Sequence, residues 1–445
     1  MFYRKLLEKL DQWAGNADRK PLVLRGARQV GKTSVVHMFS KKFDHYIYLN
    51  LDKPEDRAYF ERGYTFQTLL DSIFFAENIE KSNGKTLIFI DEIQNSPKAV
   101  SLLRYFYEEA PELFVIAAGS LLESLIDNQV SFPVGRVEYL AVRPCSFEEY
   151  LIAADETKAL EMLKQPEVPD FAHDKLSGLF HEYSTIGGMP GIIKNYIEYQ
   201  DLVKLKPIYD GLIVSYLDDV EKYARNSTMM HVIRHIINSS FVAAGGRIKF
   251  EGFGHSNYRS REIGDAFRTL EKTMLLQLVY PVVNERLPVD IRYRTPRLQM
   301  VDTGLVSHMS GIQGELLGTQ LLEDAFRGKI AEHLAGQEMI SAENSVLARL
   351  NYWLRDSRNS QAEIDWVIPF KGMLIPVEVK SGHSGKMKSL HLFMEKAPHT
   401  WAVRIYSGKT LVEKAETPGG KKFTLISLPF YRAGGMTRVL EYLIK

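Results

Sequence analysis

One short stretch restricts the possible folds of this chain more than any other feature. Residues 26–33 read GARQVGKT and match the pattern GxxxxGK(S/T), after an apolar stretch and before a helical pattern. Glycines in such a loop let backbone N–H groups turn toward phosphate without a Cβ clash. The N-terminus of the following helix presents its partial positive charge to the same anion. The sequence therefore predicts a phosphate-binding strand–loop–helix unit.

The loop residues have different predicted tasks. Lys32 can reach the β- and γ-phosphates of a nucleotide, and the Thr33 hydroxyl can ligate Mg²⁺. The predicted nucleotide-binding residues of this loop are Gly26, Ala27, Arg28, Gln29, Val30, Gly31, Lys32, Thr33 and Ser34. A chance match to the pattern is the alternative explanation.

A second motif argues against chance. Residues 87–90 are apolar and are followed by Asp91 and Glu92, so two acids stand at the C-terminal end of a predicted strand. Ligands of parallel sheets bind at that end. Asp91 can hold Mg²⁺ through water, and Glu92 can polarise the attacking water. Without the phosphate loop, both acids would read as solvated loop residues.

The N-terminal third alternates apolar, β-branched stretches with helical patterns. Several stretches are apolar almost throughout, as expected for strands that are buried on both faces. The predicted strands cover residues 21–26, 45–52, 86–93, 113–120 and 136–142. Intervening helices favour a parallel α/β sheet with right-handed crossovers.

The remaining chain divides into parts of different character. Residues from about 146 to 222 read as helical, with a break at GGMPG (187–191). Residues from about 223 to 300 mix helical patterns with a Gly-rich turn. Residues from about 320 to 445 begin with one helix and continue mainly as strands. We expect four domains, covering residues 1–150, 151–222, 223–318 and 319–445.

Five segments occur in an order that resembles a prokaryotic group of fused AAA-type P-loop ATPases. They are RKPLVLRGARQVGKTS, IFIDEIQ, VIAAGSLLESL, VGRVEYLAVRPCSFEEYL and IGGMPGII. The resemblance implies ATP and Mg²⁺ as cofactors and a helical lid over residues 151–222. It also implies that Ser120 senses the γ-phosphate, where many relatives have Asn or Thr, that Arg136 lies near the nucleotide, and that Pro190 packs near adenine. A solvated arginine and a plain turn between helices are the alternatives for the last two.

The middle region carries a short basic stretch. Its Lys and Arg residues are Lys222, Arg225, Arg234, Arg247, Lys249, Arg259 and Arg261. A helical pattern from Ser260 and a strand-like QLVYPVV follow, an order that resembles a winged helix. Such a module can contact DNA, whereas a short basic stretch can also be a solvated face.

The C-terminal part contains a second candidate site. The spacing of EIDWVIPF and MLIPVEVK around Lys371-Gly372 predicts a hairpin. Alternation along a strand places Glu378 and Lys380 on one face, where Asp365 of the neighbouring strand can meet them. Two carboxylates beside a lysine suit Mg²⁺ and a metal-activated water. Glu332, on an upstream helical stretch, can add a third carboxylate.

This arrangement resembles the PD-(D/E)xK restriction-endonuclease-like nucleases. The resemblance assigns Glu332, Asp365 and Glu378 to the metal and gives Glu378 and Lys380 catalytic roles, although Ile364 replaces the usual proline. Residues from 320 on carry more Lys and Arg than Asp and Glu, as a contact with a phosphate backbone would need. An exposed ion pair on a hairpin, or a site that binds without cleaving, remains open.

Composition excludes several other classes. The net charge of +1 gives no global attraction for a polyanion, and one cysteine, Cys145, excludes an internal disulfide. No apolar run approaches the roughly 20 residues of a membrane helix, so we expect a cytoplasmic protein without a membrane partner. The expected function is an ATPase coupled to a nuclease-like domain acting on DNA or RNA. The alternative is a nucleotide-dependent regulatory or signalling switch whose C-terminal domain binds a partner without cleaving it. A homo-oligomer and a protein partner are both compatible with the sequence.

Overall fold

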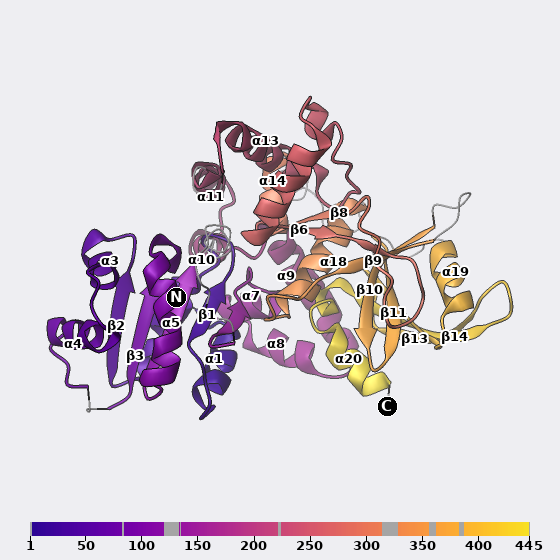
Figure 1. The fold of residues 1–445 in the computed structure, drawn as a ribbon. Helices are drawn as coiled ribbons and strands as arrows, with labels where there is room; N and C mark the ends of the chain where they lie inside the picture. The colour runs from indigo at the N-terminus through magenta and orange to yellow at the C-terminus, as the bar shows by residue number, and fades with distance from the viewer. Residues whose placement is uncertain are drawn as a thin grey trace. The chain divides into compact units, whose positions relative to one another are not determined.

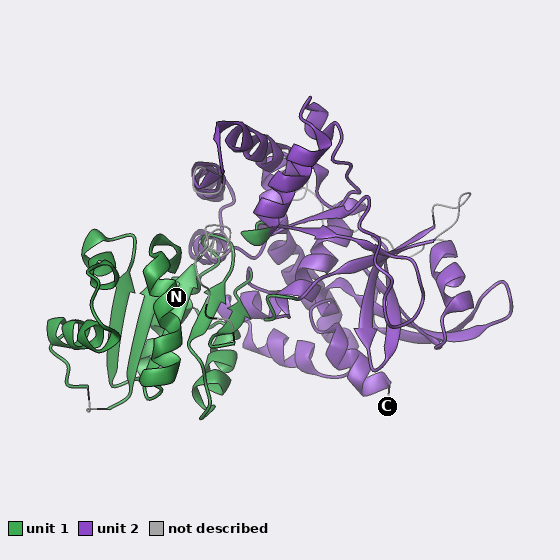
Figure 2. Cartoon of the chain, in the orientation of Figure 1, with its two compact units in different colours: residues 1–143, 272–275, 344–347 green, residues 144–271, 276–343, 348–445 purple. Residues whose placement is uncertain are grey.

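The computed structural model forms two compact units, which Figure 2 colours separately. The residues that it describes are 2–81, 84–119, 133, 135–220, 224–313, 328–355, 362–381 and 387–444. Unit 1 comprises Met1–Arg143, Lys272–Leu275 and Asn344–Leu347. Unit 2 comprises Pro144–Glu271, Leu276–Glu343 and Ala348–Lys445.

Unit 1 is built on a five-stranded sheet of order β2-β3-β4-β1-β5, in which every neighbouring pair is parallel. Its strands are β1 (Leu22–Arg25), β2 (His45–Asn50), β3 (Thr86–Asp91), β4 (Phe114–Gly119) and β5 (Glu138–Ala141). All five predicted strands and their parallel arrangement are confirmed. The near-continuous apolar stretches arise because both faces of β3 and β4 are buried.

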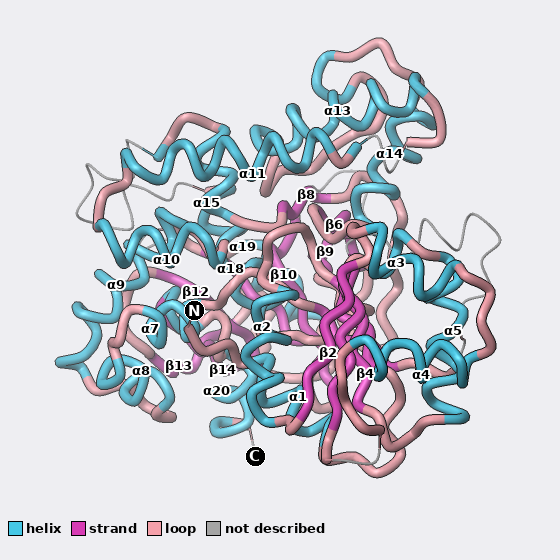
Figure 3. Tube along the Cα trace, turned by 90° about the vertical axis from the view of Figure 1, so that its left-hand side faces the viewer, coloured by secondary structure: helices cyan, strands magenta, loops and turns pink. Residues whose placement is uncertain are grey.

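Helices cover both faces of this sheet: α3, α4 and α5 lie on one side and α1 and α2 on the other (Figure 3). The helices are α1 (Leu6–Ala14), α2 (Lys32–Phe39), α3 (Pro54–Glu61), α4 (Phe66–Ala76) and α5 (Pro97–Glu109), with short 3₁₀ turns at Ser40–Lys42 and Ile93–Asn95. Successive side chains along each strand point to opposite faces of the sheet. Ile88 and Ile90 join the core cluster that includes α4 and α5. Phe114 instead meets Trp13 of α1, with ring centroids 6.1 Å apart.

Two short segments from later in the chain belong to unit 1. The Ala141 N–H donates to the carbonyl of Asn344 at 2.7 Å, and Arg143 donates to the carbonyl of Ser345 at 3.2 Å. Arg25, at the end of β1, donates to the carbonyl of Lys272 at 3.2 Å. Unit 1 is therefore discontinuous in sequence.

Unit 2 begins with helices, as the sequence predicted. These are α7 (Phe147–Ala153), α8 (Thr157–Lys164), α9 (His173–Ile186), α10 (Pro190–Tyr199) and α11 (Lys206–Asp218), with 3₁₀ turns at Asp170–Ala172 and Val203–Leu205. The predicted break at GGMPG separates α9 from α10. A Cβ on Gly187 would lie 2.3 Å from Asp302 Oδ1, and one on Gly188 would lie 2.3 Å from the Cys145 carbonyl oxygen. Close packing therefore requires both glycines.

The rest of unit 2 combines helices with two sheets (Figure 1). The middle elements are α13 (Ser227–Ala243), a 3₁₀ turn (Phe253–His255), α14 (Ser260–Lys272), β6 (Leu276–Val279), β7 (Pro281–Val282), β8 (Arg297–Met300) and α15 (Thr303–Met309). The C-terminal elements are α18 (Lys329–Ser341), β9 (Asn351–Leu354), β10 (Glu363–Phe370), β11 (Met373–Val379), α19 (Lys388–Lys396), β12 (Trp401–Tyr406), β13 (Leu411–Glu416), β14 (Lys422–Pro429), a 3₁₀ turn (Phe430–Arg432) and α20 (Met436–Leu443). The four-part domain division stays a prediction.

The larger sheet of unit 2 has the order β13-β14-β12-β11-β10-β9-β7, and β6 and β8 form a separate two-stranded sheet. The predicted hairpin is confirmed: β10 and β11 are antiparallel, and the turn residues Lys371 and Gly372 have positive φ angles of 42° and 76°. Helix α18 approaches this sheet closely at Gly336, where a Cβ would lie 2.6 Å from Trp366. Among the described helices, none is both long and apolar enough to cross a membrane.

A buried polar network connects the GGMPG turn with α18. Asp302 accepts from the Gly188 N–H at 2.5 Å and from the Leu305 N–H at 3.0 Å. Gln337 of α18 donates to Tyr183 at 3.1 Å, and Tyr183 donates to a carboxylate oxygen of Glu338 at 2.6 Å. Buried polar groups need such partners because they cannot reach water. The network therefore fixes α9, the turn and α18 relative to one another within unit 2.

We predict that Asp302→Ala lowers the free energy of unfolding by about 3 kcal/mol, since each buried donor left unpaired costs about 1–3 kcal/mol. Urea unfolding followed by tryptophan fluorescence reports mainly on unit 2, which holds Trp353, Trp366 and Trp401 of the four tryptophans. Asp201→Ala is the control, because Asp201 accepts from the Val203 N–H in an exposed position. That control should cost about 1 kcal/mol or less, and equal losses would contradict the buried-network argument.

Candidate functional site

The phosphate loop in unit 1 connects β1 to α2. Gln29 and Gly31 have positive φ angles of 62° and 95°, which turn the backbone between strand and helix. The first glycine is required by close approach: a Cβ on Gly26 would lie 2.2 Å from the carbonyl oxygen of Val142. The glycines predicted to shape the loop therefore stand where the backbone needs them.

Lys32 is the first residue of α2 and its side chain is buried. Its ammonium group donates to the carbonyl oxygens of Gly26 and Ala27, each at 2.9 Å. The backbone carbonyls at the start of the loop therefore fix the position of the Lys32 ammonium group. Such a lysine is placed to meet the oxygens of a phosphate group at the helix N-terminus.

The two residues predicted to hold Mg²⁺ lie in contact. The Thr33 hydroxyl donates to Asp91 Oδ2 at 2.7 Å, although 58 residues separate them in sequence. Tyr48, on β2, also donates to this oxygen at 3.3 Å. Burial, followed by the charge of Asp91, raises the pKa of Tyr48 to about 12, so its hydroxyl keeps its proton at neutral pH. Tyr48 was not predicted from the sequence.

Glu92 follows at the end of β3 in a left-handed conformation, with φ of 51°. Its backbone N–H donates to Asp91 Oδ1 at 3.0 Å. Gln94 donates from its side-chain amide to Glu92 Oε2 at 2.5 Å. Strain at a non-glycine residue of this kind is common at functional sites. The contact by Gln94 has no signal in the sequence.

The remaining nucleotide-site predictions have different outcomes. Ser120 lies outside the described residues. Arg136 forms an exposed ion pair with Glu108, with Nε 2.8 Å from Oε1. Pro190 opens α10 in unit 2 and is half-buried. The assigned roles of Arg136 and Pro190 stay predictions.

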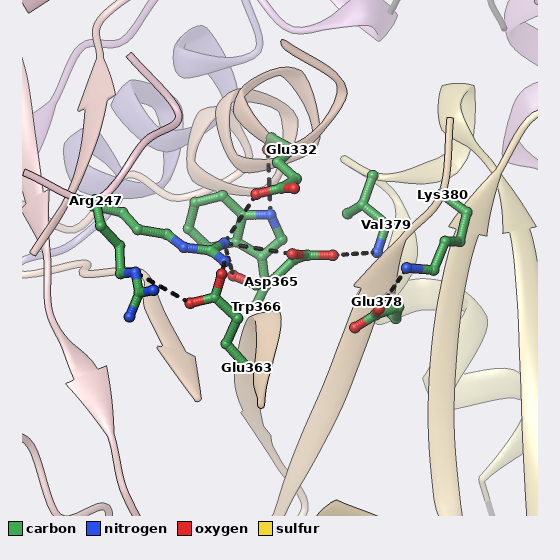
Figure 4. Close-up of polar contacts among 9 residues, drawn as sticks. Arg247, Glu332, Glu363, Asp365, Trp366, Glu378, Val379 and Lys380 are labelled. Carbon is green, nitrogen blue, oxygen red and sulfur yellow. Dashed lines mark hydrogen bonds and ion pairs between the residues drawn. The ribbon is translucent and has the colours of Figure 1, made fainter. Parts of the chain in front are cut away.

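Unit 2 contains a carboxylate cluster formed by Glu332, Glu363, Asp365 and Glu378. Buried Arg297 lies among the first three: its guanidinium nitrogens are 3.1 Å from Glu332 Oε2, 3.0 Å from Glu363 Oε1 and 3.5 Å from Asp365 Oδ1. Figure 4 shows Glu332 coming from α18, and Glu363 and Asp365 coming from β10. Arg297 bridges two of the three carboxylates that the sequence assigned to magnesium.

The other side of the cluster lies on β11. Lys380 donates to Glu378 Oε1 at 2.6 Å, and the Val379 N–H donates to Asp365 Oδ2 at 2.8 Å (Figure 4). The second oxygen, Glu378 Oε2, is buried and makes no hydrogen bond with any residue that the structure describes. The hairpin thus brings Asp365, Glu378 and Lys380 into one region, as their spacing predicted.

Burial and mutual repulsion shift the protonation equilibria of this cluster. Burial, followed by the charge of Asp365, raises the pKa of Glu332 to about 8 and that of Glu378 to about 7. Burial also raises the pKa of Asp365, against the opposing charge of Arg297. Burial lowers the pKa of Arg297, but its three carboxylates outweigh that effect and raise it overall. The arginine therefore stays charged at neutral pH.

The sequence did not predict Arg297 or Glu363 as members of this cluster. Arg247, which was counted in the basic stretch, lies with its Nε 3.5 Å from Glu363 Oε2. Lys222 of that stretch lies outside the described residues. Over the ranges given above, no three His, Cys, Asp or Glu side chains are placed to hold a metal ion. The magnesium assignment of Glu332, Asp365 and Glu378 stays a prediction.

Comparison with protein families divides the chain. Residues 18–151 match a family described as an AAA domain, and this part of the chain contains the phosphate loop and the parallel sheet of unit 1. Residues 177–316 and 327–431 match two different domains of unknown function. No curated protein is significantly similar in sequence.

Solved structures give distant similarities. The Walker-type ATPase PABY2304 of Pyrococcus abyssi is 14% identical, with a TM-score of 0.45, over 70% of this chain and 96% of that one. The Saccharomyces cerevisiae Hsp104–ADP complex is 13% identical, with a TM-score of 0.28, over 61% of this chain and 38% of that one. The Pif1 helicase of Candida albicans is 13% identical, with a TM-score of 0.23, over 40% and 48%.

We predict that Arg297→Met destabilises unit 2 more at pH 8 than at pH 5. The raised carboxyl pKa values mean that the folded state binds more protons than the unfolded state between about pH 4.5 and 8, so stability falls as pH rises through that range. Removing the arginine raises these pKa values further and steepens the fall. Breaking a buried pair costs about 3–5 kcal/mol, and we expect that loss at pH 8 and a smaller one at pH 5.

Arg432→Met is the matched control for this pH dependence. Arg432 is a buried arginine of the same unit, but it donates to the backbone carbonyls of Pro166 and Gln165. Its removal should cost the same free energy of unfolding at both pH values. A pH-independent loss for Arg297→Met, measured by urea unfolding, would contradict the assignment of coupled carboxylates.

Proposed function

We propose that the protein binds ATP with Mg²⁺ at the phosphate loop of unit 1 and hydrolyses it. The observation that carries this proposal is the direct contact between Thr33 and Asp91, beside the buried Lys32. A hydroxyl, a carboxylate and a lysine at one helix N-terminus suit a magnesium-bound triphosphate. The match of residues 18–151 to an AAA domain supports the same activity.

Each residue has a defined task in this proposal. Lys32 would exchange its carbonyl partners for phosphate oxygens, and Thr33 and Asp91 would hold the magnesium ion. The ion would offset negative charge that develops on the phosphates. Glu92 orients the attacking water and accepts its proton, and Gln94 limits the directions in which that carboxylate can point.

We predict that two substitutions separate binding from hydrolysis. Lys32→Ala should weaken ATP binding at least tenfold, since a charge-assisted hydrogen bond is worth about 1.5–3 kcal/mol. Glu92→Gln keeps the shape and should leave binding intact while lowering turnover by about 10²–10⁴-fold. Calorimetry and phosphate release measure the two effects. Unchanged binding in Lys32→Ala would remove the phosphate role from this lysine.

For unit 2 we propose a winged-helix-like middle module and a restriction-endonuclease-like domain that acts on nucleic acid with Mg²⁺. The element order α18, β9, β10, β11, α19, β12 supports the second part, because helix and strands then bring Glu332, Asp365, Glu378 and Lys380 to one region. The raised carboxyl pKa values support it too, since an added cation would relieve the repulsion among these groups. Glu332, Asp365 and Glu378 would hold the ion, and Lys380 would stabilise charge on the phosphate.

One observation favours a second candidate, a nucleotide-dependent switch whose C-terminal part binds a protein partner without cleavage. Arg297 already neutralises Glu332 and Asp365, and a metal ion would have to displace it or share these oxygens. In this alternative the cluster is a structural ion-pair network. The two candidates differ in whether divalent ions bind unit 2 at all.

We predict that Mg²⁺ or Mn²⁺ raises the melting temperature of the unit 2 transition at pH 8 and does so less at pH 6, because Glu332 and Glu378 carry more negative charge at pH 8. Glu378→Gln should abolish this shift and any metal-dependent DNA cleavage, while ATP turnover persists. Glu395→Gln, a carboxylate of α19 outside the cluster, is the control and should respond like the wild type. No metal-dependent shift and no cleavage by the wild type would favour the switch.

A further inference from the structure

Arg4 reaches the phosphate loop from outside the motif. Its side chain is buried, and its guanidinium donates to the carbonyl oxygen of Val30 at 2.9 Å and to that of Arg143 at 2.8 Å. It lies two residues before the start of α1, which is anchored by the buried side chains of Leu6, Leu10 and Trp13. The guanidinium therefore links a fixed helix to one peptide group of the loop.

The contact with Arg4 determines the direction of the Gly31 N–H, because both groups belong to the same peptide. The carbonyl of Val30 and the N–H of Gly31 belong to one planar trans peptide, so they point in opposite directions. Holding the carbonyl toward Arg4 turns the Gly31 N–H away from Arg4. Gly31 has a φ of 95° and Gln29 a φ of 62°, and glycine permits many backbone conformations. The contact from Arg4 therefore restricts the orientations open to this peptide.

We propose that Arg4 is a positioning residue that holds the Val30–Gly31 peptide so that the Gly31 N–H points to the phosphate of the bound nucleotide. The inference rests on the proposed binding of ATP at this loop. Arginine suits the task because its planar fork reaches two carbonyl oxygens at fixed angles. A lysine in its place supplies one flexible point charge and reaches them less well.

The first test is the affinity of the full-length protein for Mg·ADP, measured by calorimetry. We expect Arg4→Gln to weaken binding about tenfold and Arg4→Lys to fall between Arg4→Gln and the wild type. Arg19→Gln is the matched control, because Arg19 in the same unit also donates to two backbone carbonyls, those of Pro111 and Glu112, at 3.0 and 3.1 Å. This control should bind like the wild type.

A second readout follows the peptide group directly. Val–Gly pairs occur in this sequence at 30–31 and 134–135. Labelling with ¹³C′-valine and ¹⁵N-glycine therefore gives two selected amide signals, and Val134→Ala removes and so assigns the second. In the wild type, Mg·ADP should change the amide chemical shift of Gly31. In Arg4→Gln, the chemical shift of Gly31 without nucleotide should differ from that of the wild type, and Mg·ADP should change it less. A general loss of folding would not move this one signal selectively.

The outcomes separate this inference from the proposed function. Wild-type affinity in Arg4→Gln, an unchanged Gly31 signal, or an equal loss in Arg19→Gln would overturn the role of Arg4. If the wild type itself binds no Mg·ADP, the proposed function of the loop fails instead. Should Arg4→Gln not fold, Arg4→Lys carries the same test, and wild-type affinity and Gly31 shift in that variant would overturn the role.

Discussion

The buried polar face of α18 is the constraint on which unit 2 depends. A helix satisfies its own backbone, but the buried side chains of His333, Gln337 and Glu338 need partners from elsewhere in the chain. They find them in the backbone N–H groups of Met300, Thr303 and Phe147. One helix thereby orders the segments before it, and it carries Glu332 to the carboxylate cluster. Changes far from the cluster can alter its geometry through this helix.

Features that depend on neighbours in sequence were predicted well. The strands of unit 1 are apolar because both faces are buried, and the hairpin follows from alternation around Lys371 and Gly372. The closeness of Thr33 and Asp91, both assigned to Mg²⁺, also follows, since the loop and helix start after β1 and the end of β3 lie at the same edge of a parallel sheet. In each case local chemistry and a known sheet geometry suffice.

Contacts made by single arginines could not be predicted in the same way. Arg297 lies 35 residues from Glu332, and Arg4 lies 139 residues from Arg143. An arginine in a sequence does not show which oxygen it will meet, because only the folded chain brings the two together. Counting charges even grouped Arg247 with a basic stretch, whereas the structure pairs it with Glu363. The need for a buried cation was implied by the clustered acids, but its identity was not.

The discontinuity of unit 1 has an evolutionary consequence. The chain passes between the units at 143/144, 271/272, 275/276, 343/344 and 347/348. A single recombination point after residue 143 would give the sheet of unit 1 a new C-terminal partner but would remove the segments that bond to Arg25, Ala141 and Arg143. Exchange of unit 2 between relatives therefore preserves the hydrogen bonds at the β1–β5 edge of the sheet only if the incoming sequence contains segments equivalent to residues 272–275 and 344–347. The two units are inherited most easily together.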